Sequence, residues 1–122
     1  MTIKQKAERI GSKIVRREGH FAVPTNEHWY PACKQMHSYA VEQPFRHGAR
    51  WTFNGNGDVP DFKPSMNISG GPFPDGRIER CHYFVTAGRI QYCGDSTHAM
   101  AGQPIDLSDI PQERLLLMVI IA

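Results

Sequence analysis

A hairpin over residues 79–94 constrains the fold of this chain more than any other segment. Two apolar and aromatic runs flank Ala87-Gly88, a pair with the length of a two-residue turn between antiparallel strands. Side chains alternate along a strand, so one face of the hairpin collects the apolar residues and should pack on the core. That face carries Cys81, Tyr83, Val85, Ile90 and Tyr92. The more polar face places His82 across the ladder from Cys93.

The rest of the chain is rich in turn residues. Its 122 residues include 11 Gly and 9 Pro, a density that favours many short strands over long helices. Short strands are predicted at 38–42, 51–53 and 63–69, within otherwise irregular sequence over 20–50, and Asn54–Gly57 is a strong turn signal. The expected class is mainly β (α+β), a small antiparallel sheet or a partly open barrel.

The two ends of the chain are less regular. Apolar residues recur at spacings of three and four over residues 2–17, which predicts an amphipathic helix that ends at Gly19. The predicted organisation is therefore a helix over 1–19 and one β-rich domain over 20–122. After a possible helix start at 108–111, the apolar run 115–122 fits either a C-terminal helix or a buried strand, and it offers a possible homodimer contact.

Charge and cysteine content limit the function classes. A net charge of +2 is too small to argue for a nucleic-acid partner, and residues 115–122 are too few to span a membrane. The N-terminal segment is charged throughout, unlike a signal peptide, and three cysteines do not suggest a disulfide framework. We therefore expect a cytoplasmic protein with reduced thiols.

Three kinds of chemistry are compatible with the side chains. The first is a serine activated by a histidine base and an acidic group that orients it. The candidates are Ser65, Ser69 and Ser96 as nucleophiles, His82 and His98 as bases, and Asp95 as the orienting group. No Gly-x-Ser-x-Gly motif singles out one serine, so the residues alone favour ordinary turn roles for them.

The other two kinds of chemistry use cysteine. Cys93 opposite His82 would suit a cysteine nucleophile, although a free, half-buried cysteine is the commoner explanation. A zinc site could combine Cys33 and His37 with His98 and either Cys81 or Cys93. The spacing is unlike a Cys-x-x-Cys pair, so a polar loop with a buried cysteine is favoured over the metal.

Five motifs in a fixed order resemble a known family. They are Arg50–Gly55, Pro60–Ser65, Arg80–Val85, Gly88–Gln91 and Asp95–Gln103, followed by Pro104–Leu107. Over about residues 28–108 the chain resembles short tailed-phage proteins of unknown function. These are similar to BubE, the serine peptidase of bacterial ubiquitin-like conjugation operons.

The resemblance implies a set of roles. Ser65 becomes the nucleophile and His82 its general base in acyl transfer, with Asp95 as the first choice and His98 as the second for the third member. Backbone N–H groups, with Gly70 and Gly71 as candidates, would stabilise the oxyanion. The partner would be a protein or peptide substrate, and no cofactor is expected.

Two departures from the resembling family bear on metal binding. Many relatives carry cysteine where this chain has Tyr30 and Ser96. Such a pair suggests a metal or a bridge in those relatives, so no metal is predicted here. The alternative function is a non-enzymatic phage accessory or protein-binding module that uses the basic N-terminal segment and exposed aromatic residues.

Overall fold

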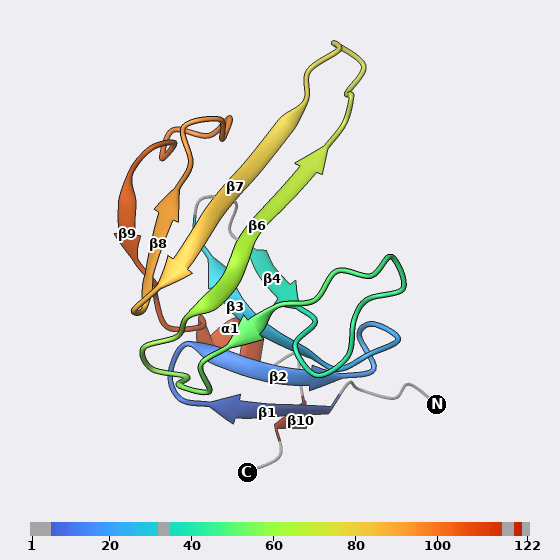
Figure 1. Ribbon diagram of the computed structural model, residues 1–122, viewed down its shortest axis with the longest axis vertical. Helices are drawn as coiled ribbons and strands as arrows, with labels where there is room; N and C mark the ends of the chain where they lie inside the picture. Colours follow the sequence, from blue (N-terminus) through green and yellow to red (C-terminus); the bar gives the residue numbers. More distant parts are fainter. Residues whose placement is uncertain (1–5, 32–34, 116–118, 121–122) are drawn as a thin grey trace.

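The computed structural model describes residues 6–31, 35–115 and 119–120, and within them the chain forms two five-stranded sheets (Figure 1). The first sheet has the order β10-β1-β2-β3-β4, with β1 (Lys6–Ile10), β2 (Ile14–Glu18), β3 (Thr25–Tyr30), β4 (Gln35–Tyr39) and β10 (Val119–Ile120). The second has the order β5-β6-β7-β8-β9, with β5 (Thr52–Phe53), β6 (Phe62–Gly70), β7 (Glu79–Thr86), β8 (Arg89–Tyr92) and β9 (Pro104–Asp106). The mainly β class is confirmed, but the described strands close no barrel.

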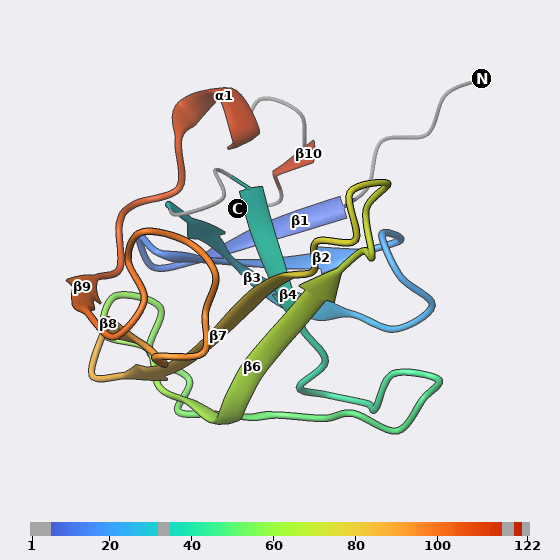
Figure 2. The same ribbon diagram turned by 90° about the horizontal axis from the view of Figure 1, so that it is seen from above.

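Aromatic rings fill the space between the sheets. Tyr39 from β4 stacks on Phe62 from β6 with ring centroids 4.0 Å apart, and Phe53 also stacks on Phe62, with ring centroids 4.8 Å apart. Figure 2 shows β3 and β4 lying against β6 and β7. The core therefore joins the two sheets along β4 and β6.

The predicted hairpin is confirmed. Thr86 pairs with Arg89 and Phe84 with Gln91, and the turn residues Ala87 and Gly88 both have positive φ, at 51° and 75°. Two positive φ values give the turn whose twist matches that of the strands. The five residues of the predicted apolar face are all at most 5% exposed.

The predicted N-terminal helix is wrong, because β1 and β2 form an antiparallel hairpin instead. Gly11 has a φ of 75° in the turn between them, a conformation that interrupts a helix. Both faces of β2 are covered, since Ile14 enters the main core while Val15 packs with Ala7 and Leu115 in a second cluster. When both faces of a strand are buried, its sequence loses the alternation of apolar and polar residues. The apolar residues of this segment then had the spacing that is typical of a helix.

The middle and the C-terminal end contain structure that the sequence prediction located only in part. Strand β3 was not predicted, and β4 begins three residues before the expected strand at 38–42. The helix α1 (Gln112–Leu115) follows Pro111, and β10 then pairs in parallel with β1. The C-terminal run thus provides a strand as well as the end of a helix. Among the described residues, no helix is long and apolar enough to cross a membrane.

A buried polar network links the two sheets through the hydroxyl of Tyr83 on β7. This oxygen lies 3.0 Å from His28 Nε2 and 2.7 Å from His37 Nδ1. His28 Nδ1 faces the carbonyl oxygen of Trp29 at 3.1 Å, so Nδ1 carries the proton and Nε2 accepts from Tyr83. The Tyr83 hydroxyl in turn accepts from His37 Nδ1–H. Burial lowers the pKa of His28 to about 4. Burial and, to a lesser extent, charge repulsion from His28 lower the pKa of His37 to about 3.

The lowered pKa values of these two histidines predict that acid destabilises the folded protein. Their pKa values in the folded protein lie below the value of about 6.5 expected for an unfolded chain, so the unfolded state binds more protons. Above about pH 6.5 these histidines should not lower the free energy of unfolding. As the pH drops from there toward 4, each histidine should lower it by about 1.4 kcal/mol per pH unit.

Denaturant unfolding of the wild type and of His37→Phe between pH 7 and pH 5 measures this slope. The variant keeps the ring that stacks on Tyr30 at 4.2 Å but removes one titrating group, so its slope should be about half as steep. Equal stability of the wild type at pH 7 and pH 5 would contradict the prediction.

Candidate active site

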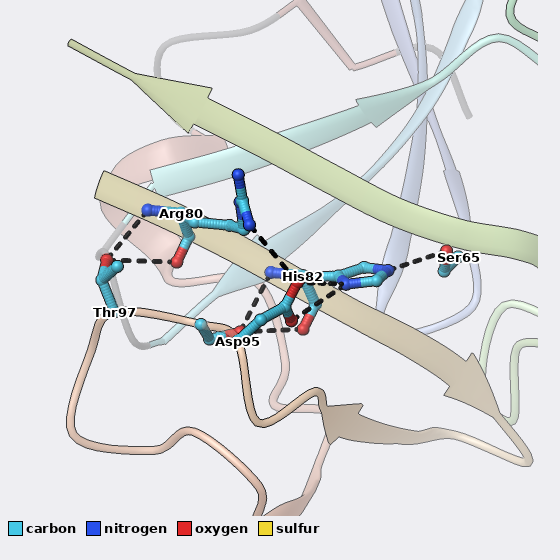
Figure 3. A network of polar contacts seen from close by, with 6 residues as sticks. Ser65, Arg80, His82, Asp95 and Thr97 are labelled. Atoms are coloured by element: carbon cyan, nitrogen blue, oxygen red, sulfur yellow. Dashed lines mark hydrogen bonds and ion pairs between the residues drawn. The ribbon is translucent and has the colours of Figure 1, made fainter. Parts of the chain in front are cut away.

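Three side chains from separate elements form a hydrogen-bonded chain on the surface of the second sheet (Figure 3). Ser65 Oγ on β6 lies 3.1 Å from His82 Nε2 on β7. His82 Nδ1 lies 3.1 and 3.2 Å from the two carboxylate oxygens of Asp95, in the loop after β8. A carboxylate only accepts, so Nδ1 carries the proton and Nε2 presents a lone pair to the Ser65 hydroxyl. This is the tautomer that a general base requires.

Ser65 owes its orientation to an irregular stretch of β6. The pairing of β6 with β7 shifts register between Phe62 and Met66, and such irregularities redirect side chains. Trp51 Nε1–H donates to the carbonyl oxygen of Ser65 at 3.2 Å and fixes the backbone there. The sequence prediction placed Ser65 within a strand but contained no signal for this irregularity.

His82 is held by the backbone contacts of Ser96. The Ser96 hydroxyl accepts from His82 N–H at 3.1 Å and donates to His82 C=O at 2.9 Å. Cys93 N–H also donates to this carbonyl at 2.8 Å, which places Cys93 beside His82 as the predicted register requires. Ser96, one of the three nucleophile candidates, therefore anchors the backbone of the base.

The loop that carries Asp95 is fastened to β7. Thr97 N–H donates to Arg80 C=O at 2.9 Å, and Arg80 N–H donates to Thr97 Oγ1 at 2.8 Å. Arg80 Nη1 also lies 3.6 Å from Asp95 Oδ2. These contacts keep the carboxylate turned toward His82 (Figure 3).

His98, the second choice for the third member, belongs to a different cluster. Its Nδ1 accepts from Met100 N–H at 3.2 Å, and its Nε2–H donates to the Tyr30 hydroxyl at 2.6 Å. Partial burial lowers the pKa of His98. Both ring nitrogens are thus engaged with other partners, and the contact to His82 Nδ1 comes from Asp95.

The candidates for cysteine chemistry are also separated. Cys33 lies outside the described residues, Cys81 is buried, and His37 is bound to Tyr83. Cys93 does lie near the site, with its Sγ, a ring nitrogen of His82 and an Asp95 oxygen all within 4.8 Å of one another. Those three could ligate a metal ion, but each His82 nitrogen already faces Ser65 or Asp95.

The Cys93 thiol is poorly suited to be the nucleophile. Partial burial, and to a lesser extent the negative charge of Asp95, raise its pKa, which disfavours the reactive thiolate. The nearby imidazole already has a partner on each nitrogen. The geometry therefore favours the hydroxyl of Ser65 over this thiol.

The predicted oxyanion donors Gly70 and Gly71 do not lie near Ser65. Gly70 is five residues further along the same strand, and at 3.3 Å per residue this is about 17 Å. A cavity of about 940 Å³ does open beside Ser65 and is also lined by Asn67 and Trp51. Ser65 therefore borders a space large enough for a ligand.

A two-sheet β protein with a hydroxyl, an imidazole and a carboxylate in this order has the arrangement that serine hydrolases use. The family described as "Bacterial ubiquitination-like system serine protease (BubE)" matches residues 4–93, about three quarters of the chain, and the chain belongs to this family. The resemblance to BubE is thus confirmed, although the match includes the N-terminal hairpin and stops before Asp95. No curated protein and no solved structure matches the chain.

From the hydrogen bonds of Ser96 we expect its replacement to lower the stability of the protein measurably. Ser96→Ala leaves the partly buried His82 N–H without its partner, which should lower the free energy of unfolding by about 1–3 kcal/mol. Ser108→Ala is the control, because Ser108 Oγ is buried and bonds to none of the described residues. Denaturant titration of both variants checks this, and equal losses would contradict the anchoring role.

Proposed function

We propose that this protein is a serine peptidase that cleaves a protein or peptide by acyl transfer to Ser65. The observation that carries the proposal is the 3.1 Å contact between Ser65 Oγ and His82 Nε2, with Asp95 on the opposite ring nitrogen. A serine hydroxyl becomes nucleophilic only when a neighbouring base removes its proton. The serine protease family name supports the same activity.

The reaction follows from the hydrogen-bond directions. Ser65 O–H gives its proton to His82 Nε2 while Oγ attacks the substrate carbonyl carbon, and Asp95 stabilises the imidazolium that forms. His82 then protonates the leaving amine as the C–N bond breaks, which leaves an ester on Ser65. A water molecule, deprotonated by His82, hydrolyses the ester and restores the hydroxyl.

Covalent labelling with a fluorophosphonate tests this role of Ser65. The wild type should be labelled once per chain, and Ser65→Ala should not be labelled. Loss of the base in His82→Ala, or of the orienting carboxylate in Asp95→Asn, should slow labelling by roughly 10²–10⁴-fold.

Ser108→Ala is the hydroxyl control and should be labelled like the wild type. Circular dichroism and thermal unfolding of each variant separate loss of the reaction from loss of the fold. Absence of labelling in a folded wild type would reject the peptidase and favour the alternative, a non-enzymatic binding module. That alternative no longer has its predicted basic helix, since the segment forms β1 and β2.

In this mechanism Asn67 is the donor to the oxyanion. Asn67 lies two residues beyond Ser65, pairs with His82 across the ladder, and lines the same cavity. Residues two apart on a strand share a face, so the Asn67 amide lies on the face of the reacting carbonyl. Side-chain amides serve as oxyanion donors in other serine hydrolases.

Asn67→Ala should lower kcat/KM for peptide cleavage by roughly 10²–10³-fold, mostly in kcat. The reason is that the donor acts on charge that develops only in the transition state. Steady-state kinetics on a chromogenic peptide measure this, with the free energy of unfolding as a check on folding. A change confined to KM would show that Asn67 contacts the substrate but not the oxyanion.

The substrate is proposed only by class. The family name places this type of protease in a ubiquitination-like system, and a ubiquitin-like protein is a candidate substrate only where such a system accompanies the gene. A phage origin, a cytoplasmic location and a homodimer remain predictions. For a phage protein, a capsid, tail or host protein would be the alternative target.

A further inference from the structure

Strand β6, which carries Ser65, has an open edge. On one side it pairs with β7 over Met66–Gly70, and on the other side β5 reaches only Phe62 and Lys63. Among the described residues, no strand pairs with this second side from Ser65 to Gly70. An unpaired strand edge offers backbone donors and acceptors to an added strand.

The directions of the N–H and C=O groups on β7 show which residues of β6 present their own backbone groups at the open edge. The carbonyl of His82 accepts from Cys93 and that of Arg80 accepts from Thr97, so both point away from β6. Their ladder partners Asn67 and Ser69 therefore form the pairs without mutual hydrogen bonds. The N–H and C=O groups of Asn67 and Ser69 face the open edge.

Two cavities line this edge from end to end. The cavity of about 940 Å³ contains Ser65, Asn67 and Ile68, and a second one of about 500 Å³ contains Ile68, Ser69 and Gly70. Ile68 and Gln35 contribute to both, so the two cavities adjoin. The space suits an extended chain of several residues that begins at the reactive hydroxyl.

The wall beside Ser65 is aromatic. Phe21, Phe45 and Trp51 line the larger cavity, with ring centroids 5.2 Å apart for Phe21 and Phe45 and 6.1 Å apart for Phe45 and Trp51. Phe21 is 44% exposed although it is large and apolar. An apolar side chain of a ligand would cover this surface.

We propose that the open edge of β6 binds an extended segment of the protein substrate as an added strand, with a large apolar side chain next to the scissile bond. Backbone hydrogen bonds to Asn67 and Ser69 would supply affinity, and the wall of Phe21, Phe45 and Trp51 would supply selectivity. This inference rests on the proposed peptidase activity and names the substrate that the same site accepts.

A peptide library identifies the sequence preference. Peptides derived from a digested bacterial proteome are incubated with wild-type protein, and cleavage sites are read by mass spectrometry. Aromatic or large aliphatic residues should be enriched at one position that flanks the cleaved bond. Phe45→Ala should reduce kcat/KM for such a peptide by about tenfold, whereas cleavage sites with no apolar preference would contradict the apolar subsite.

The added strand is tested with one of the cleaved peptides. Ser69→Pro removes the edge N–H without touching a ladder hydrogen bond to β7, while Ser69→Ala keeps the N–H. Peptide cleavage by S69A should exceed that by S69P by roughly 3- to 10-fold, the effect of one hydrogen bond. Fluorophosphonate labelling, which needs no extended substrate, should differ little between the two.

A second measurement does not depend on the variants folding. Single N-methylation along the peptide should slow its cleavage by wild-type protein at alternate positions, because alternate amides of an added strand face its partner. Uniform rates across the methylated series, or equal cleavage by S69P and S69A, would overturn the added strand. Failure of wild-type labelling would reject the peptidase itself, so the two failures are distinguishable.

Discussion

The rest of the structure depends on the hydrogen bonds that the Tyr83 hydroxyl makes between the two sheets. It contacts His28 on β3 and His37 on β4 at 3.0 and 2.7 Å, and so it bonds β7 of the second sheet to two strands of the first. All three side chains are at most 3% exposed, so at Tyr83 these contacts take the place of hydrogen bonds to water. The two contacts therefore hold β7 against β3 and β4.

The buried contacts of Tyr83 also affect the outer face of β7, because successive side chains of a strand point to opposite faces. His82 precedes Tyr83 on β7, so its side chain emerges on the opposite face from the buried network. Because Tyr83 holds β7 in place, it also helps to place the imidazole of His82 relative to β6. The ladder that starts at Met66 then brings Ser65, one residue earlier, beside that imidazole. Core packing and the geometry of the reacting groups thus share one strand.

The hairpin 79–94 and its buried face could be predicted from the sequence because they depend on local alternation and a two-residue turn. The pair β1 and β2 could not, because covering both faces of β2 hides its period. Ser65 was found only through the family resemblance, since the irregularity that turns it toward His82 has no motif of its own. Asp95 was predicted as the third member, but the contacts that orient it were not: Arg80 on β7 lies 3.6 Å from its carboxylate and also binds Thr97 of the same loop.

Hydrogen bonds at two points hold the loop after β8. The Tyr30 hydroxyl lies 2.6 Å from His98 Nε2, and Ser96 bonds both backbone groups of His82. Asp95 directly precedes Ser96, so the bonds of Ser96 to the His82 backbone also keep the Asp95 carboxylate beside the imidazole. A hydroxyl suits residue 96 because it accepts from the His82 N–H and donates to the His82 carbonyl at the same time. The position of Asp95 is thus determined by the neighbours that bind the His82 backbone.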